Sequence, residues 1–457
     1  AGFSSAFAFA KIARCRPGRF MSRRLAAAAA LIVAGVLLGR TYDSVYTPQT
    51  AAEYYAEPFE GVRSRVAAAA AAAAHCGRGH CQKNPRIVLV TGAAGFVGFH
   101  TSLQLHREGD VVLGLDNFNT YYDVRLKRKR AALLERAGMK TLIQGDVCDG
   151  ELLKLMLSAG RVTHVIHLAA QAGVRYSLKK PLAYVEANVR CFVTLLEAVH
   201  AVNNSVPITY ASSSSVYGIN KLVPFSETHR VDSQVSLYGA TKKSNENIAH
   251  VYHNLHGLKL TGLRFFTVYG PIGRPDMAYF GFTQAILAGK KLTEFRNADG
   301  TELQRDFTFI TDIVDGVIAA SRLAAPFEVF NLGNTHPERV SSLIHLLEEG
   351  LGMKANVSIA PISAGDVPMT YADVSHARHL LGYVPKVSLS EGVRHFLQWY
   401  AAYYSIKLPA HMTPTRKEAN EMQRTYDVAE NLHGRSQSRK ARDRRLAIAR
   451  TGQNTLQ

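Results

Sequence analysis

The chain has 457 residues and a formal net charge of +18, with 47% hydrophobic and 20% charged residues. That apolar content is enough to bury a core, which excludes a wholly disordered protein. Five cysteines in so long a chain exclude a small disulfide-framed scaffold. The chain has one apolar run that could cross a membrane, and that run is short and lies near the start. A polytopic membrane protein is therefore excluded as well.

The positive charge lies mainly in the flanks of the chain. Residues 1–86 carry a net charge of +8 and residues 412–457 carry +5, which leaves +5 for everything between them. The densest basic cluster, residues 125–130, lacks the interleaved aromatic residues that are typical of a nucleic-acid surface. We therefore predict that this cluster is the solvated face of a helix and that nucleic acid is not a partner.

An apolar, uncharged stretch at residues 25–38 follows Arg23 and Arg24 and precedes Arg40. Counted as residues 20–39, with the arginines reaching toward the interface, it is long enough to cross a hydrocarbon layer of about 30 Å. Basic residues precede it and acidic residues follow it, which predicts a single-pass anchor with a cytoplasmic amino terminus and a lumenal main domain. A cleaved signal peptide and an organellar transit peptide are the open alternatives.

Both segments that flank the main domain are of unusual composition. Residues 66–74 are nearly all alanine, which predicts a helical spacer. Residues 75–81 hold two cysteines and two histidines spaced too tightly for the usual zinc pattern, so no metal site is predicted. We expect a solvated linker there, or a local disulfide between Cys76 and Cys81 in an oxidising lumen. Residues 412–457 alternate charge and polarity, which predicts a largely disordered or loosely helical basic tail.

Residues 86–411 have the pattern of a folded domain, unlike the N-terminal segment 1–85. Residues 87–91 form an apolar run of the kind found in buried parallel strands. Further strand-like runs, separated by helical stretches, lie at residues 111–115, 141–144, 164–168, 208–212 and 259–265. This alternation predicts an α/β fold, a Rossmann-type doubly wound parallel sheet with helices on both faces.

Three glycines follow the first strand at the spacing GxxGxxG: Gly92, Gly95 and Gly98. Gly92 makes the turn, Gly95 lets the backbone approach a pyrophosphate, and Gly98 lets the next helix pack closely against the strand. The amino terminus of that helix then faces the anion. Asp116, at the end of the second strand, is placed to accept both ribose hydroxyls and would repel a 2′-phosphate. The predicted cofactor is therefore NAD rather than NADP.

Further cofactor contacts are predicted where the third and fourth strands end. Asp146 and Val147 follow the third strand and are predicted to flank the adenine, and small residues after the fourth strand leave room for the cofactor. His167, in that fourth strand, is predicted to be packed in the core rather than to act as a base. The predicted NAD-binding set also includes Phe96, Val97, Asn117, Leu168, Ala169, Ala170, Tyr238 and Lys242.

A serine run, residues 212–215, ends another strand of the predicted sheet, where open parallel sheets place ligands. Tyr238 and Lys242 follow at the spacing YxxxK, which places both on one face of a helix. A free tyrosine has a pKa of about 10, and a lysine ammonium and a positive cofactor ring both favour the phenolate. We predict that Tyr238 is the catalytic base, that Lys242 keeps it ionised, and that Ser213 hydrogen-bonds the same substrate hydroxyl.

These residues resemble the extended short-chain dehydrogenase/reductase superfamily over roughly residues 86–405. Within it, the chain is similar to the UDP-glucuronate 4-epimerase family in the stretches HLAAQAGVRYS from 167, YASSSSVYG from 210, FFTVYGPIGRPDMA from 265 and RDFTFI from 305. The resemblance implies a two-part domain. An NAD-binding part, about 86–265, precedes a smaller UDP-sugar-binding part, about 266–405, which returns to the sheet.

The substrate contacts are predicted in the second part and in the serine run. Arg305 has the planar fork that clamps a diphosphate in bidentate fashion, although a surface ion pair with Asp306 is the alternative. Thr267 and Arg274 follow the sixth strand, where a sugar carboxylate would be met. The predicted substrate-binding set is Ser214, Ser215, Thr267, Arg274 and Arg305.

The resemblance implies an isomerase that converts UDP-glucuronate to UDP-galacturonate through a transient 4-keto sugar and supplies galacturonate for polysaccharide synthesis. We also expect a homodimer. Together with the apolar stretch, the resemblance predicts a Golgi membrane enzyme with a lumenal catalytic domain, with an organellar or cytoplasmic location as the alternative.

Several rival functions share part of this chemistry. Sugar-nucleotide 4,6-dehydratases and UDP-glucuronate decarboxylases also oxidise carbon 4, but acids follow their catalytic hydroxyl residue, where this chain has Ser214 and Ser215. A UDP-galactose-type epimerase has no need of residues that hold a carboxylate. A non-catalytic NAD-binding domain is disfavoured because Ser213, Tyr238 and Lys242 are present together.

Overall fold

The computed structural model describes residues 58–74, 85–362 and 365–426. The predicted anchor at residues 20–39, the Cys76–Cys81 pair and the tail beyond residue 426 lie outside these ranges. Among the described helices, none combines the length and the apolar character needed to cross a bilayer.

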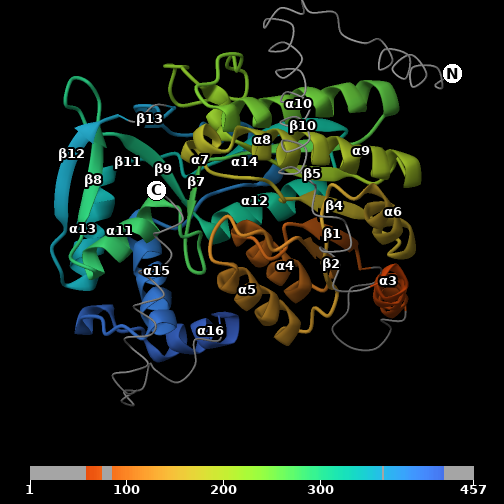
Figure 1. Ribbon diagram of the computed structural model, residues 1–457, viewed down its shortest axis with the longest axis horizontal. Helices are drawn as coiled ribbons and strands as arrows, with labels where there is room; N and C mark the ends of the chain where they lie inside the picture. Colours follow the sequence, from red (N-terminus) through yellow and green to blue (C-terminus); the bar gives the residue numbers. More distant parts are fainter. Residues whose placement is uncertain (1–57, 75–84, 363–364, 427–457) are drawn as a thin grey trace, which may run out of the picture. The chain divides into compact units, whose positions relative to one another are not determined.

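Seven parallel strands form the central sheet, in the order β10-β6-β5-β4-β1-β2-β3 (Figure 1). Their bounds are β1 Ile87–Thr91, β2 Val111–Asp116, β3 Leu142–Gln144, β4 His164–His167, β5 Ile208–Ser213, β6 Leu260–Phe265 and β10 Phe327–Leu332. All five residues of β1 are buried, and Val88 lies opposite Val112 on one side and His164 on the other. The strand order is that of the dinucleotide-binding fold, which confirms the predicted fold class.

Helices cover both faces of this sheet. On one face, α4 (Phe96–Arg107) packs against α5 (Val124–Arg136) and α12 (Ile310–Leu323). On the other face, α9 (Cys191–Val202) packs against α6 (Gly150–Ala159) and α10 (Leu237–His256), as Figure 1 shows. Strand β10 pairs with β6, so the C-terminal part of the chain, which is predicted to bind the UDP-sugar, returns to the first sheet.

The substrate-binding part has two smaller sheets. Strand β9 (Gln304–Phe309) pairs with β7 (Thr267–Tyr269), β11 (Pro337–Arg339) and β13 (Met369–Thr370), and β8 (Lys291–Arg296) pairs with β12 (Asn356–Pro361). Its helices are α11 Ala278–Leu287, α13 Val340–Leu351, α14 Ser375–Leu381 and α15 Leu389–Tyr404. Short helical segments are α7 Val174–Lys179, α8 Pro181–Tyr184, η2 Val185–Arg190, η3 Ser214–Tyr217 and η4 Ala410–Met412.

The alanine-rich helix is part of the domain rather than a spacer. It runs as α3 (Phe59–Ala74), and its buried residues Val62, Val66 and Ala70 recur every four positions on the face that packs against α6. Arg65 donates to the carbonyl oxygen of Lys140 at 2.9 Å. The helix is confirmed, and the predicted spacer role is wrong because one helical face is apolar and buried.

Within residues 412–426 the tail is helical, the second of the two predicted alternatives, and it is not disordered. Helix α16 (Arg416–Tyr426) buries Met422 and packs on α4, where Arg107 Nη2 donates to Thr425 Oγ1 at 3.0 Å. The ring centroid of Tyr426 lies 5.9 Å from that of His100. The few apolar residues of this segment fall on one face of the helix, a pattern that is hard to recognise among alternating charged residues.

Candidate active site

The loop between β1 and α4 has the shape of a phosphate cradle. Gly92 has a φ of +70°, and its N–H donates to Leu115 O at 2.7 Å, which closes the turn against β2. A Cβ added to Gly98 would overlap the Gly92 carbonyl oxygen and lie 3.1 Å from Ala93 Cα. The N-cap residue of α4 is Gly95, which has no side chain to cap the helix. The N–H groups of the first turn of α4 therefore remain for an anion. These residues therefore fit the pyrophosphate of a dinucleotide.

Asp116 is fixed at the end of β2 by two backbone amides. Its Oδ2 accepts from Ala94 N at 3.0 Å and its Oδ1 accepts from Phe118 N at 2.8 Å. Each carboxylate oxygen keeps a further lone pair, so the group can still accept two ribose hydroxyls. Its fixed negative charge disfavours a 2′-phosphate in the same place.

We expect the parent protein to use NAD well and NADP poorly, and Asp116→Asn to reduce that preference by about 10- to 100-fold, the effect of losing one charged hydrogen-bonding group. Asparagine keeps the volume and one acceptor oxygen but carries no charge. Activity of cofactor-stripped protein, reconstituted with each dinucleotide in turn, is the measurement. Equal activity of the parent with both would show that Asp116 does not meet the ribose.

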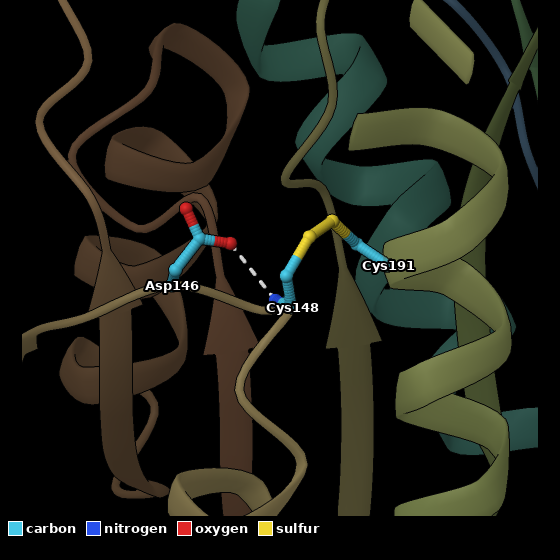
Figure 2. Close-up of side chains that lie close together, drawn as sticks. All are labelled: Asp146, Cys148 and Cys191. Carbon is cyan, nitrogen blue, oxygen red and sulfur yellow. Dashed lines mark hydrogen bonds between the residues drawn. A yellow bond between two sulfur atoms is a disulfide. The ribbon is translucent and has the colours of Figure 1, made fainter. Parts of the chain in front are cut away.

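A disulfide lies next to the predicted adenine side of the site (Figure 2). Asp146 accepts from Asn117 Nδ2 and from Cys148 N, both at 2.8 Å, and Cys148 is bonded to Cys191 at the start of α9. Potential ligand atoms of Asp146, Cys148 and Cys191 lie within 4.8 Å of one another, but paired cysteines offer no thiolate to a metal. The disulfide instead ties the turn that carries Asp146 and Val147 to α9.

Breaking this cross-link should lower the free energy of unfolding by about 2–4 kcal/mol, because it closes a long loop in the unfolded chain. Cys148 and Cys191 are 43 residues apart. Urea unfolding of the parent with and without a phosphine reductant measures the effect. The Cys148→Ser/Cys191→Ser variant is the control, because its stability should not respond to reductant. A parent midpoint that is identical in both conditions would contradict the prediction.

The structure brings two of the three predicted catalytic residues near one another. Ser213 ends β5, and Tyr238 lies in the first turn of α10, whose N-cap Ser236 accepts from Gly239 N at 3.1 Å. Ser213 lies close enough to the Tyr238 hydroxyl to lower the pKa of that phenol. Ser213 Oγ also caps η3, where it accepts from Ser215 N at 3.2 Å. The strand end and the helix start thus place both hydroxyls at the carboxyl edge of the sheet.

Lys242 is buried one turn further along α10. Its Nζ donates to Ala211 O at 2.7 Å, and burial lowers its pKa to about 8. Burial raises the pKa of Tyr238, and the Arg274 charge and the nearby Ser213 hydroxyl lower it. Arg274 is thus a second cation near the phenol, and the role of Lys242 in keeping Tyr238 ionised stays a prediction.

Two predicted substrate residues are engaged by neighbouring acids. Arg274 pairs with Asp276. Arg305 Nη2 donates to Asp366 Oδ1 at 2.6 Å, whereas the alternative partner, Asp306, is buried and accepts from the backbone N–H groups of Asn334, Thr335 and Ala372. An Arg305–Asp306 ion pair was therefore the wrong alternative.

Thr267, in β7, and the segment before Arg274 leave the same edge of the sheet as Ser213. His167 is a core residue, as predicted. Its Nδ1 lies 2.8 Å from Thr91 Oγ1, and burial lowers its pKa to about 3. The assignment of Thr267, Ser214 and Ser215 to the substrate stays a prediction.

Arg130 is a site-supporting residue that the sequence did not reveal. It is fully buried and donates to Ala94 O at 3.1 Å, to Ile272 O at 3.1 Å and to Gly273 O at 3.1 Å. Lys127 is buried too, so the predicted solvated face was wrong for part of the basic cluster. Arg130 lies four residues after Leu126 and four before Leu134, on the apolar face of α5, and that spacing was the available signal. The guanidinium ties the cofactor loop to the turn before Arg274.

Comparisons with known proteins show the family of the chain. A family model described as GDP-mannose 4,6 dehydratase matches residues 89–396. UDP-glucuronate 4-epimerase 4 of Arabidopsis thaliana is 52% identical over 332 residues, which cover 70% of this chain and 76% of that protein. A UDP-glucuronic acid 4-epimerase from Bacillus cereus, solved in complex with UDP-glucuronic acid and NAD, is 36% identical with a TM-score of 0.64, over 70% of this chain and 100% of that one.

A more distant structure, a UDP-glucose 4-epimerase from Thermotoga maritima with UDP-glucose, is 30% identical with a TM-score of 0.62, over 69% of this chain and 99% of that one. The shared fold therefore extends to epimerases of neutral sugars, and the higher identities are with epimerases of the uronate. The chain belongs to the UDP-glucuronate 4-epimerase family, among the NAD-dependent epimerases and dehydratases of the extended short-chain dehydrogenase/reductase superfamily.

Proposed function

We propose that this protein interconverts UDP-glucuronate and UDP-galacturonate by NAD-dependent epimerisation at carbon 4. The observation that carries the proposal is the closeness of Ser213 and Arg274 to the Tyr238 hydroxyl, whose pKa both lower, with serines rather than acids at 214 and 215. In the family pattern, a dehydratase has acids directly after the catalytic hydroxyl residue to move a further proton, and a decarboxylase commonly has a glutamate two places after it.

In the proposed mechanism, Tyr238 removes the proton from the hydroxyl on carbon 4, and Ser213 orients that hydroxyl. NAD, when bound, accepts the hydride from carbon 4 and later returns it. The resulting 4-keto sugar rotates in the site, so that hydride returns to the opposite face of carbon 4. Tyr238 gives its proton back to the oxygen on that carbon, which becomes the new hydroxyl. Lys242 and Asp116 are placed to hold the cofactor riboses. No net redox change results.

The carboxylate of the substrate creates a hazard in this mechanism. In the intermediate, the ketone at carbon 4 is β to the carboxylate on carbon 5, so carbon dioxide is lost easily when the carbon–carboxylate bond aligns with the carbonyl orbitals. Arg274 and Thr267 are proposed to hold the carboxylate out of that alignment. Supplying galacturonate for polysaccharide synthesis is the proposed cellular role.

Incubation of the purified protein with UDP-glucuronate, followed by chromatography of the nucleotide sugars, tests this function. We expect UDP-galacturonate to form and the same mixture to arise from either sugar. UDP-pentose and carbon dioxide as the main products would support a decarboxylase instead, and a 4-keto-6-deoxy product would support a dehydratase.

We propose further that residues 20–39 anchor the protein in the Golgi membrane, with the catalytic domain in the lumen. The basic residues before this stretch and the acidic residues after it support this orientation. The Cys148–Cys191 disulfide supports an oxidising compartment. Protease treatment of sealed vesicles is the test, since the catalytic domain should be protected until detergent is added. Digestion without detergent, or import into a plastid, would overturn the proposal.

We also propose a homodimer formed through α8, η2 and α10. These elements pack together, and they expose apolar side chains to solvent, with Leu182 at 64% and Leu255 at 72% exposure. Exposed apolar side chains of this size support a surface that a partner covers. Light scattering on the purified catalytic domain should give twice the mass of one chain, and a monomer at micromolar concentration would contradict the proposal.

A further inference from the structure

Arg274 is held along one edge by a neighbouring carboxylate. Its Nε donates to Asp276 Oδ1 at 3.1 Å and its Nη2 to Asp276 Oδ2, and the two side chains are 23% and 12% exposed. This side-on pairing occupies the Nε–Nη2 edge of the guanidinium. Within residues 58–74, 85–362 and 365–426, the guanidinium has no second hydrogen-bonded side chain. Its Nη1 end therefore remains for another anion.

Asp276 is itself fixed by a residue from the cofactor-binding half. The hydroxyl of Tyr121 donates to Asp276 Oδ2 at 3.0 Å, and burial, followed by the Asp276 charge, raises the pKa of Tyr121, so the hydroxyl stays a donor. Gly173, with a φ of +100°, leaves room for this contact. A Cβ added there would overlap the Tyr121 hydroxyl and lie 3.5 Å from Asp276 Oδ2.

The Tyr121–Asp276–Arg274 cluster adjoins the proposed base. Aromatic rings lead from Tyr121 to Tyr238, with centroid separations of 4.8 Å to Tyr176, 6.3 Å from there to Tyr184 and 6.1 Å from there to Tyr238. Arg274 lies close enough to Tyr238 for its charge to lower the pKa of the phenol. Arg274 and its partner Asp276 therefore lie beside the proposed base.

We infer that Asp276, held by Tyr121, is a positioning residue that fixes the direction of the Arg274 guanidinium and so fixes how the sugar carboxylate is held. The inference rests on the proposed function of Arg274. An arginine side chain has several rotatable bonds, and an unpaired guanidinium would follow a substrate carboxylate into any orientation. A bidentate acid on the far edge restricts the carboxylate to one approach, end-on to Nη1.

The loss of carbon dioxide from the 4-keto intermediate gives this inference a product that can be measured. If the carboxylate rotates into line with the 4-keto group, the bond between carbon 5 and the carboxylate breaks. Its electron pair then moves into an enolate at carbons 4 and 5, and carbon dioxide leaves. Solvent protonates carbon 5, and hydride return gives a UDP-pentose. A loosened Arg274 should therefore change which product forms rather than only how fast the substrate turns over.

The test is the ratio of UDP-pentose to UDP-galacturonate made from UDP-glucuronate by the full protein with NAD. Asp276→Asn, which keeps the volume but not the charged bidentate pair, should raise this ratio by about tenfold or more, since small misplacements of reacting groups have effects of that size. Tyr121→Phe removes only the third hydrogen bond and should raise the ratio less. Asp276→Glu, which can still form the ion pair, should restore most of the parent ratio.

Asp232→Asn is the matched control. Arg230 and Asp232 have the same two-residue spacing and the same Nε-to-carboxylate bond, at 2.9 Å, but lie on an exposed loop, so this change should leave the ratio unaltered. A purely structural role for Asp276 would lower both products together, and an unchanged ratio in Asp276→Asn would overturn the inference. If the parent itself makes no UDP-galacturonate, the proposed function fails instead.

Discussion

Replacing Tyr238 by phenylalanine should lower kcat by about 10²–10⁴-fold, the usual contribution of a general acid–base group. The phenylalanine ring still packs beside Tyr184, whose ring centroid lies 6.1 Å from that of Tyr238, so little packing is lost. The substitution removes the hydroxyl near Ser213 that is proposed to take the proton from carbon 4. Binding of UDP and NAD should be nearly unchanged.

The pH dependence gives a second measure of the same role. Because burial raises the pKa of Tyr238, the phenol of the free protein is mostly protonated at neutral pH. Its ionised fraction therefore increases as the pH rises toward that pKa. The kcat/KM of the parent should therefore rise toward alkaline pH, and the phenylalanine variant should lose that rise. Tyr252→Phe, on the same helix, is the control, because the Tyr252 hydroxyl pairs with Glu197 away from the site. Near-normal turnover of Tyr238→Phe would show that the base is misassigned.

Replacing Gly98 by alanine should abolish tight NAD binding, with an affinity loss of at least about 100-fold, the effect of a misplaced reacting or binding group. The new Cβ would overlap the Gly92 carbonyl oxygen, so either the turn after β1 opens or α4 moves away from the sheet. Both changes displace the N–H groups that face the pyrophosphate. The purified variant should carry little NAD and should bind added NAD weakly in calorimetry.

Gly281→Ala is the matched control for this change. Gly281 also lies in the first turns of a helix, α11, but an added Cβ there has nothing within 4 Å. The control should keep its NAD and be equally or more stable by up to about 1 kcal/mol, because alanine favours a helix over glycine. A Gly98→Ala protein that is folded and still copurifies with NAD would contradict the cradle assigned to the β1–α4 loop.

Most of the fold could be predicted from patterns within short stretches of the sequence. The buried run of β1, the glycine turn and Asp116 lie within one short stretch, and each requirement is set by the backbone of that stretch itself. The YxxxK spacing similarly places Tyr238 and Lys242 on one face because helix geometry alone decides it. These features were predictable because neighbouring residues are enough to determine them.

The missed features depend on contacts between distant segments. The buried guanidinium of Arg130 is satisfied by the carbonyl groups of Ile272 and Gly273, which are distant in the sequence. Cys148 lies beside Cys191 because α6 packs against α9 in the fold. In the same way, Arg274 comes near Tyr238 from a segment 36 residues further along the chain. No local pattern contains this information.

The central claim is that hydride leaves carbon 4 and returns to the same carbon without leaving the site. UDP-glucuronate deuterated at carbon 4 tests it most directly, with product analysis by mass spectrometry and nuclear magnetic resonance in ordinary water that contains unlabelled NAD. The account predicts UDP-galacturonate with the deuterium retained at carbon 4 and unlabelled NAD in solution. Loss of the label to water, or its appearance in the free cofactor pool, would contradict it.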